Sequence, residues 1–191
     1  MNGITDKVLS LMKSDNWENR RAAARMDVNT HGILLNDQDF RVRCELASTN
    51  DLLHRTLKDD LDLRVRLEVA KFNDIFHYQF VNDTEWEVRA EVAKSSRLYH
   101  YRLKDDPSWA VRWKIVCYDT SMHRYFLEDE DYCIRWKIAA DSSEFHAFLK
   151  DDIEEEVRLV IAGFSDKYHR QFRNDRSEAV RDVVLNYKKG K

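Results

Sequence analysis

Apolar residues recur along this chain in a pattern that repeats every 23 residues. An arginine recurs at one fixed position of each repeat, which we number zero; these residues are Arg20, Arg43, Arg66, Arg89, Arg112, Arg135, Arg158 and Arg181. Positions −1, +3 and +4 are apolar in almost every repeat, as in Val88, Val92 and Ala93. Position +1 differs from one repeat to the next. A fixed period of this length predicts a solenoid, in which each repeat buries its apolar face against its neighbours.

The pattern distinguishes a helix from a strand. Residues 65–70, "VRLEVA", alternate as a strand would, so a leucine-rich repeat lined by a strand is an alternative. A strand would bury positions −1, +1 and +3 together. A helix buries −1, +3 and +4 and places +1 on another face. Because position +1 is not consistently apolar, the pattern favours a helix.

Polar residues at two positions predict where the helices begin. An aspartate lies six residues before the arginine in seven repeats and is predicted to be the N-cap of a longer helix A. These residues are Asp37, Asp60, Asp83, Asp106, Asp129, Asp152 and Asp175. Pro107 then falls at the first helical position, which proline tolerates well. A second cap is expected at position +7, before a short α or 3-10 helix B; these residues are Asp27, Asn50, Asn73, Ser96, Asp119, Ser142 and Ser165.

The sequence therefore predicts an all-α solenoid of about eight two-helix repeats. We expect one repeat domain over residues 1–191. Within it, residues 1–13 form an N-terminal capping helix, residues 14–187 the repeats, and residues 188–191 a basic tail.

Composition agrees with this fold and narrows the chemistry. Charged residues make up 35% of the chain, above the usual quarter, and one proline with four glycines is too few for a turn-rich β fold. The net charge of −3 gives no overall attraction to nucleic acid or membrane. Cys44, Cys117 and Cys133 have no metal or redox spacing. With no signal peptide or membrane span in the sequence, we expect a cytoplasmic protein.

The repeat unit also resembles a known family. An aspartate, then Val-Arg, an alanine a few residues later, a polar corner and a short apolar helix resemble the leucine-rich repeat variant, and are similar to the shorter HEAT-like repeats. The resemblance covers residues 14–187. It implies a right-handed superhelix and a role in binding proteins, although a few HEAT-like proteins bind DNA or excise alkylated bases. A histidine in every repeat is not part of the family's usual pattern.

All seven histidines occupy one position of the repeat: His31, His54, His77, His100, His123, His146 and His169. A metal site needs ligands that converge within a few ångströms, but equivalent positions in stacked helices lie about 8–10 Å apart. We therefore expect each histidine to bond a nearby carbonyl or side chain, and we expect no metal and no cofactor. Each semi-buried arginine needs a partner, and the aspartate ladder of its own or an adjacent repeat is the natural choice.

Function is expected where the repeats differ. Position −3 is aromatic in the middle of the array and acidic at its end, and position +2 changes from acidic to basic. The candidate partner-binding residues are Trp86, Trp109, Trp113, Lys114, Tyr132, Trp136 and Lys137, and the candidate acidic ridge is Glu45, Glu68 and Glu91. Tryptophan is favoured at binding hot spots. The alternative is that these aromatics fill gaps between helices.

These features favour a non-catalytic scaffold that binds an extended or helical segment of another protein, without a membrane. We find no glycine-rich phosphate loop, nucleophile motif or metal spacing. One alternative is a nucleic-acid-binding or base-excision protein, in which helix B cations follow phosphates and tryptophans stack on bases. Another is an acidic decoy that inhibits a nucleic-acid-binding protein.

Overall fold

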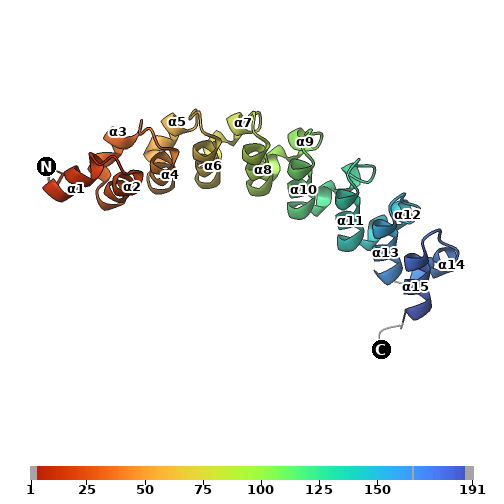
Figure 1. Ribbon diagram of the computed structural model, residues 1–191. Helices are drawn as coiled ribbons and strands as arrows, with labels where there is room; N and C mark the ends of the chain where they lie inside the picture. The colour runs from red at the N-terminus through yellow and green to blue at the C-terminus, as the bar shows by residue number, and fades with distance from the viewer. Residues whose placement is uncertain (1–3, 165, 188–191) are drawn as a thin grey trace. The chain divides into compact units, whose positions relative to one another are not determined.

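The computed structural model describes residues 4–164 and 166–187, and these residues form helices joined by short corners. Contacts divide the chain into two compact units, Met1–Tyr99 and His100–Lys191, which we call the N-terminal and C-terminal units. Within each unit, longer helices lie side by side in one row, and short helices form a second row beside them (Figure 1). The all-α solenoid predicted from the 23-residue period is confirmed.

The N-terminal unit opens with α1 (Asp6–Met12), which packs on the first long helix. The long helices are α2 (Trp17–Met26), α4 (Phe40–Thr49), α6 (Leu63–Phe72) and α8 (Trp86–Ser95). Each is followed by a 3-10 turn: η1 (Val28–Thr30), η2 (Asp51–Leu53), η3 (Asp74–Phe76) and η4 (Arg97–Tyr99). The first three turns continue into α3 (His31–Leu34), α5 (His54–Leu57) and α7 (His77–Phe80). Helix B is thus a 3-10 turn followed by one turn of α-helix.

The C-terminal unit begins at α9 (His100–Leu103). Its long helices are α10 (Trp109–Tyr118), α11 (Tyr132–Asp141), α13 (Glu155–Phe164) and α15 (Glu178–Asn186). Its remaining short elements are η5 (Thr120–Tyr125), η6 (Ser143–Phe145), α12 (His146–Leu149), η7 (Asp166–Tyr168) and α14 (His169–Phe172). In this unit, helix η5 remains 3-10 throughout.

The core consists of the positions that the helical pattern predicted. Val88, Val92 and Ala93 are completely buried, as are Ile134, Ile138 and Ala139 at the same three positions of a later repeat. Because each neighbouring helix repeats this stripe, burial of apolar surface continues from one repeat to the next.

The predicted N-cap of helix A was wrong by two residues. The cap lies at position −4, where the side chains of Asp39, Asp62 and Asp131 accept from the backbone N–H two residues on. Asp37, which was predicted to cap α4, instead accepts from the N–H of Asp39 and from Arg20. Since both carboxylate oxygens of Asp37 accept from Arg20, the cap of α4 lies two residues further on, at Asp39.

Pro107 consequently lies outside α10. The helix begins at Trp109 and has Ser108 as its N-cap. The predicted first helical position is thus also displaced by two residues, because Asp106 accepts from the N–H of Ser108 rather than capping the helix itself.

The second cap was predicted at the right position. The side chains of Asp27, Asn50, Asn73 and Asp119 accept from the N–H two residues on, at the start of a 3-10 turn. Ser142 is a cap residue whose side chain makes no such bond. Ser165 and the basic tail, residues 188–191, lie outside the described residues.

Candidate functional site

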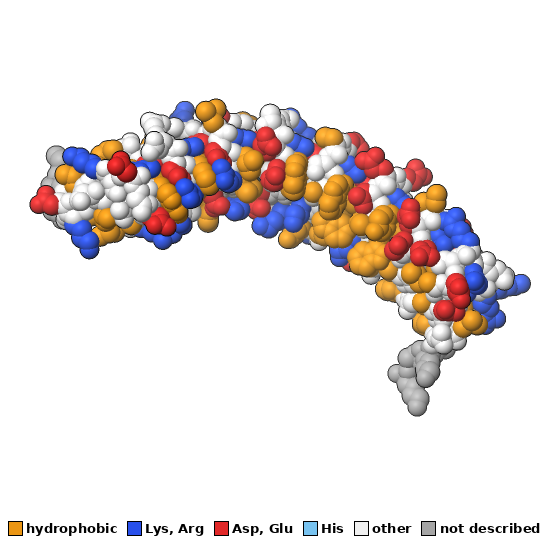
Figure 2. Space-filling model, in the orientation of Figure 1, with side chains coloured by type: hydrophobic (Ala, Val, Ile, Leu, Met, Phe, Trp, Pro, Cys, Tyr) orange, Lys and Arg blue, Asp and Glu red, His pale blue; other side chains and the backbone are white. Residues whose placement is uncertain are grey.

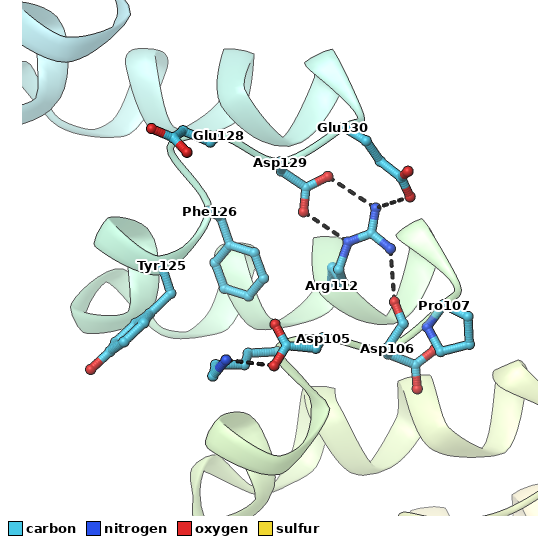
Figure 3. A pocket seen from close by; sticks show the side chains of 10 residues that line it. Asp105, Asp106, Pro107, Arg112, Tyr125, Phe126, Glu128, Asp129 and Glu130 are labelled. Carbon is cyan, nitrogen blue, oxygen red and sulfur yellow. Dashed lines mark hydrogen bonds and ion pairs between the residues drawn. The ribbon is translucent and has the colours of Figure 1, made fainter.

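An arginine–aspartate ladder joins successive repeats. Arg112 donates from Nε to Asp129 Oδ2 at 2.7 Å and from Nη2 to Oδ1 at 3.0 Å, while its Nη1 donates to the Asp106 carbonyl at 2.7 Å (Figure 3). In five other repeats the arginine likewise donates two hydrogen bonds to the aspartate of the next repeat, and we call this arrangement a two-pronged pair. These pairs are Arg20–Asp37, Arg43–Asp60, Arg66–Asp83, Arg135–Asp152 and Arg158–Asp175. The predicted pairing is confirmed, with the partner in the adjacent repeat.

The ladder is a structural element. The hydrogen bond to Asp129 raises the pKa of Arg112. Burial pushes the pKa of Asp152 upward, but hydrogen bonds from Arg135 and the Glu154 N–H outweigh it, so that the pKa lies below its usual value. The hollow of about 350 Å³ beside Arg112 is lined largely by these already engaged groups (Figure 3). The ion pair of Arg112 with Asp129 in this hollow therefore contributes to the packing of successive repeats.

The histidine ladder is also structural, as predicted. The side chains are buried, and Nε2 lies 2.6–3.0 Å from the backbone carbonyl seven residues earlier; this holds for His31, His54, His77, His123, His146 and His169. Asn50 Nδ2 lies 3.0 Å from His31 Nδ1. Since an amide nitrogen only donates, His31 carries its proton on Nε2 and donates it to the Ala24 carbonyl. Within residues 4–164 and 166–187, no three His, Cys, Asp or Glu side chains are placed to hold a metal.

The acidic ridge predicted at Glu45, Glu68 and Glu91 is not a free acidic surface. Glu45 is buried and accepts from Arg21 and Arg25 of the preceding repeat, both at 2.7 Å. Although burial acts to raise the pKa of Glu45, these two bonds lower it overall.

The other two carboxylates of the ridge are paired as well. Lys71 contacts Glu68 at 2.7 Å, and Lys94 contacts Glu91 at 3.0 Å, each within one helix. Glu45, in addition, contributes to the packing of repeats because it links α4 to α2.

Three lysines that follow short helices are neutralised by the adjacent aspartate. Lys58 pairs with Asp59 at 2.6 Å and Lys104 with Asp105 at 2.5 Å, and Lys150 pairs with Asp151. These pairs reduce the positive charge that helix B would offer to phosphates.

The aromatic residues at position −3 are covered in the first repeats. The Arg41 guanidinium stacks 3.7 Å from the centre of the Trp17 ring, and that of Arg64 lies 3.2 Å from the centre of the Phe40 ring. Each arginine comes from position −2 of the following repeat, and Arg41 also pairs with Asp39. For these two aromatics, packing between repeats is the correct interpretation.

In the C-terminal unit the same row is uncovered. Trp109 is 52% exposed and Tyr132 is 41% exposed, and position −2 of the following repeat holds Cys133 or Glu156 in place of an arginine. Trp136 at position +1 is 37% exposed. We call Trp109, Trp113, Tyr132 and Trp136 the aromatic surface; hydrophobic side chains gather over α10 and α11 in Figure 2.

Hydrogen-bonding groups on the aromatic surface remain available. Lys137 pairs with Asp141 at 2.6 Å, whereas Lys114 makes no ion pair with any described residue. The indole N–H groups of Trp109, Trp113 and Trp136 likewise have no acceptor within the part of the chain that is described. Trp86 is exposed too, but it belongs to the N-terminal unit and is not part of this surface.

Sequence reasoning missed the residues that decide which aromatics are exposed. The signal was present at position −2, where Arg41 and Arg64 stand in the repeats after Trp17 and Phe40. It also missed exposed aliphatic residues at position +9 of three consecutive repeats, Leu52, Ile75 and Leu98.

Comparison with known proteins supports the architecture. No family model matches the chain, and no curated protein matches it. A solved structure described as "a leucine-rich repeat variant with a novel repetitive protein structural motif" is similar, with a TM-score of 0.81 and 22% identity. The match covers 94% of this chain and 79% of that one. The fold implied by the sequence resemblance is thereby confirmed.

Among the described residues, every helix is too short or too polar to cross a lipid bilayer.

Proposed function

We propose that this protein is a non-catalytic scaffold that binds another protein through its aromatic surface. The observation that supports this proposal is the contrast within one row of equivalent positions. Arginines cover Trp17 and Phe40, whereas Trp109 and Tyr132 stand exposed. One arginine per repeat is enough to cover an aromatic ring at this position. The exposed rings of Trp109 and Tyr132 therefore suggest that a partner protein binds over them.

The charged groups support a protein partner over a nucleic acid. Lys114 offers one free cation, but Glu155 and Glu156 lie on α13, the next long helix after α11. A phosphate chain that crossed the aromatic surface would meet these carboxylates at close range, which is unfavourable. A polypeptide can place opposite charges over both groups. The three free cysteines suit a reducing compartment such as the cytoplasm.

Affinity capture from native lysate tests the proposal. The tagged full chain is incubated with lysate that has been treated with nuclease, and bound proteins are identified by mass spectrometry. We expect a protein partner that is recovered by the wild type, and by a Phe148→Ala control, but lost with the Trp109→Ala, Trp136→Ala double variant. Phe148 is a matched control because it is an exposed aromatic of the same unit on helix B.

Two outcomes would contradict the proposal. One is a partner that disappears on nuclease treatment, which would favour nucleic-acid binding. The other is a partner that the double variant retains in full while circular dichroism shows that the variant is folded.

A further inference from the structure

The first residues of the four long helices in the C-terminal unit form an ordered row. α10 begins with Trp109, α11 with Tyr132, α13 with Glu155 and α15 with Glu178. α10 packs on α11, α11 on α13, and α13 on α15. A ligand lying across these helices at their N-terminal ends therefore meets two exposed aromatic rings and then two exposed carboxylates.

The usual spacing of packed helices favours one backbone conformation for a segment that crosses this row. Neighbouring packed helices lie about 8–10 Å apart. A polyproline II helix rises about 3.1 Å per residue with three residues per turn, so every third side chain returns to the same face after about 9.3 Å. Residues i, i+3, i+6 and i+9 of such a segment can each contact one of the four helices.

Other regular conformations do not match the row. Three residues of a β-strand also span about 10 Å, but side chains i and i+3 point to opposite faces. An α-helix advances about 1.5 Å per residue, so the same step takes about six residues. Six residues are not a whole number of turns at 3.6 residues per turn, and seven residues, which nearly complete two turns, span about 10.5 Å and exceed the step of about 8–10 Å between packed helices.

Hydrogen bonding and ring chemistry agree with this conformation. A polyproline II segment has no internal hydrogen bonds, so its carbonyl groups are free to accept. The indole N–H groups of Trp109, Trp113 and Trp136 have no acceptor among the described residues. Aromatic surfaces with such donors are the usual environment in which proline rings bind.

We infer that the partner presents a proline-rich segment in the polyproline II conformation, with two prolines three residues apart followed at the same interval by lysine or arginine. Written along the row, the pattern is Pro-x-x-Pro-x-x-[Lys/Arg]-x-x-[Lys/Arg], in either chain direction. The prolines contact Trp109 and Tyr132, and the basic residues contact Glu155 and Glu178. This inference rests on the proposed function and names the chemistry of its ligand.

A peptide library tests the inference without knowledge of the natural partner. Random dodecapeptides displayed on phage are selected on the immobilised full chain, and the enriched sequences are aligned. We expect prolines at a spacing of three and a basic residue three positions beyond. A synthetic consensus peptide carrying a fluorescent label should then bind with an affinity at least tenfold weaker for the Trp109→Ala, Tyr132→Ala variant, and with unchanged affinity for Phe148→Ala.

A second variant tests the charge assignment separately. Glu155→Gln with Glu178→Gln should keep the preference for prolines and lose the preference for lysine and arginine, since both residues are exposed and their substitution leaves the aromatic rings in place. Neither carboxylate forms one of the two-pronged pairs of the ladder, and the amide oxygen of glutamine can still accept from the Ser177 hydroxyl, which now bonds Glu155, so this variant is expected to fold normally.

Three results would overturn the inference. The enriched peptides could lack prolines three residues apart, or the same peptides could be enriched equally on the Trp109→Ala, Tyr132→Ala variant. The preference for lysine and arginine could also persist in the Glu155→Gln, Glu178→Gln variant. If lysate capture still yields a protein that depends on the aromatic surface, the scaffold proposal stands and only the ligand conformation is wrong. If a labelled single-stranded oligonucleotide binds the surface and the peptides do not, both proposals fail.

Discussion

Asp129→Asn should destabilise the fold far more than a neighbouring substitution of the same kind. The side chains of Arg112 and Asp129 are only 7% and 5% exposed, and two hydrogen bonds join them (Figure 3). Removing one partner of a buried ion pair costs about 3–5 kcal/mol. We expect about 3 kcal/mol, the lower end, because Arg112 keeps its bond to the Asp106 carbonyl and the asparagine oxygen can still accept from the Asp131 N–H.

Asp105→Asn is the matched control. Asp105 also pairs with a cation, Lys104, but its side chain is 83% exposed. Exposed pairs contribute about 0–1 kcal/mol, so the two variants should differ by about 2 kcal/mol or more. The difference is measured from urea unfolding followed by circular dichroism, using midpoint and slope together.

A third variant separates charge burial from loss of packing. Arg112→Met with Asp129→Leu removes both charges, so it leaves no unpaired ion in the interior and should cost less than Asp129→Asn alone. The reasoning is refuted if Asp129→Asn and Asp105→Asn lie within about 0.5 kcal/mol of each other, the range of an ordinary surface substitution.

Three further predictions follow from buried polar groups. Since the pKa of Asp152 is lowered in the folded protein, protonation favours unfolding; the stability advantage of the wild type over Asp152→Asn should be full at pH 7 and shrink as the pH falls below about 4, as urea midpoints would show. His54→Leu removes the side chain whose Nε2 lies 2.6 Å from the Ala47 carbonyl, so that this carbonyl loses its donor. The free energy of unfolding in the same assay should fall by about 1–3 kcal/mol. Arg55→Leu, at the exposed neighbouring position, should change it little. Chiefly through burial, the pKa of Cys44 rises to about 12, so iodoacetamide at pH 8 should modify it about a thousandfold more slowly in the folded than in the urea-unfolded chain; comparable rates by peptide mass mapping would show that the thiol is accessible.

The helices could be predicted from the sequence because the same apolar and polar positions recur every 23 residues. Variable residues at position +1 favoured a helix over a strand, and Val88, Val92 and Ala93 are buried as a helical stripe requires. The cap of helix A was misplaced because two polar positions competed for it. A carboxylate can cap a helix or hold a guanidinium from the preceding repeat, and only the packed structure shows that Asp37 does the second.

The candidate site was harder to predict because exposure depends on the neighbouring repeat. Trp17 and Trp109 occupy the same position and are identical in isolation. Arg41 covers the first ring, whereas the residue in the place of that arginine next to Trp109 is Cys133. Likewise, the sequence pattern places Glu45 on an acidic ridge, and only the structure shows that Arg21 and Arg25 of the preceding repeat pair with it.

Site-specific photocrosslinking tests the central claim most directly. A benzophenone amino acid replaces Tyr132 on the aromatic surface or Phe148 on helix B, and nuclease-treated native lysate is irradiated with each protein. The scaffold proposal predicts a discrete protein adduct from position 132 that is absent from position 148. Adducts from position 148 alone, equal adducts from both, or no protein adduct from position 132 would contradict it.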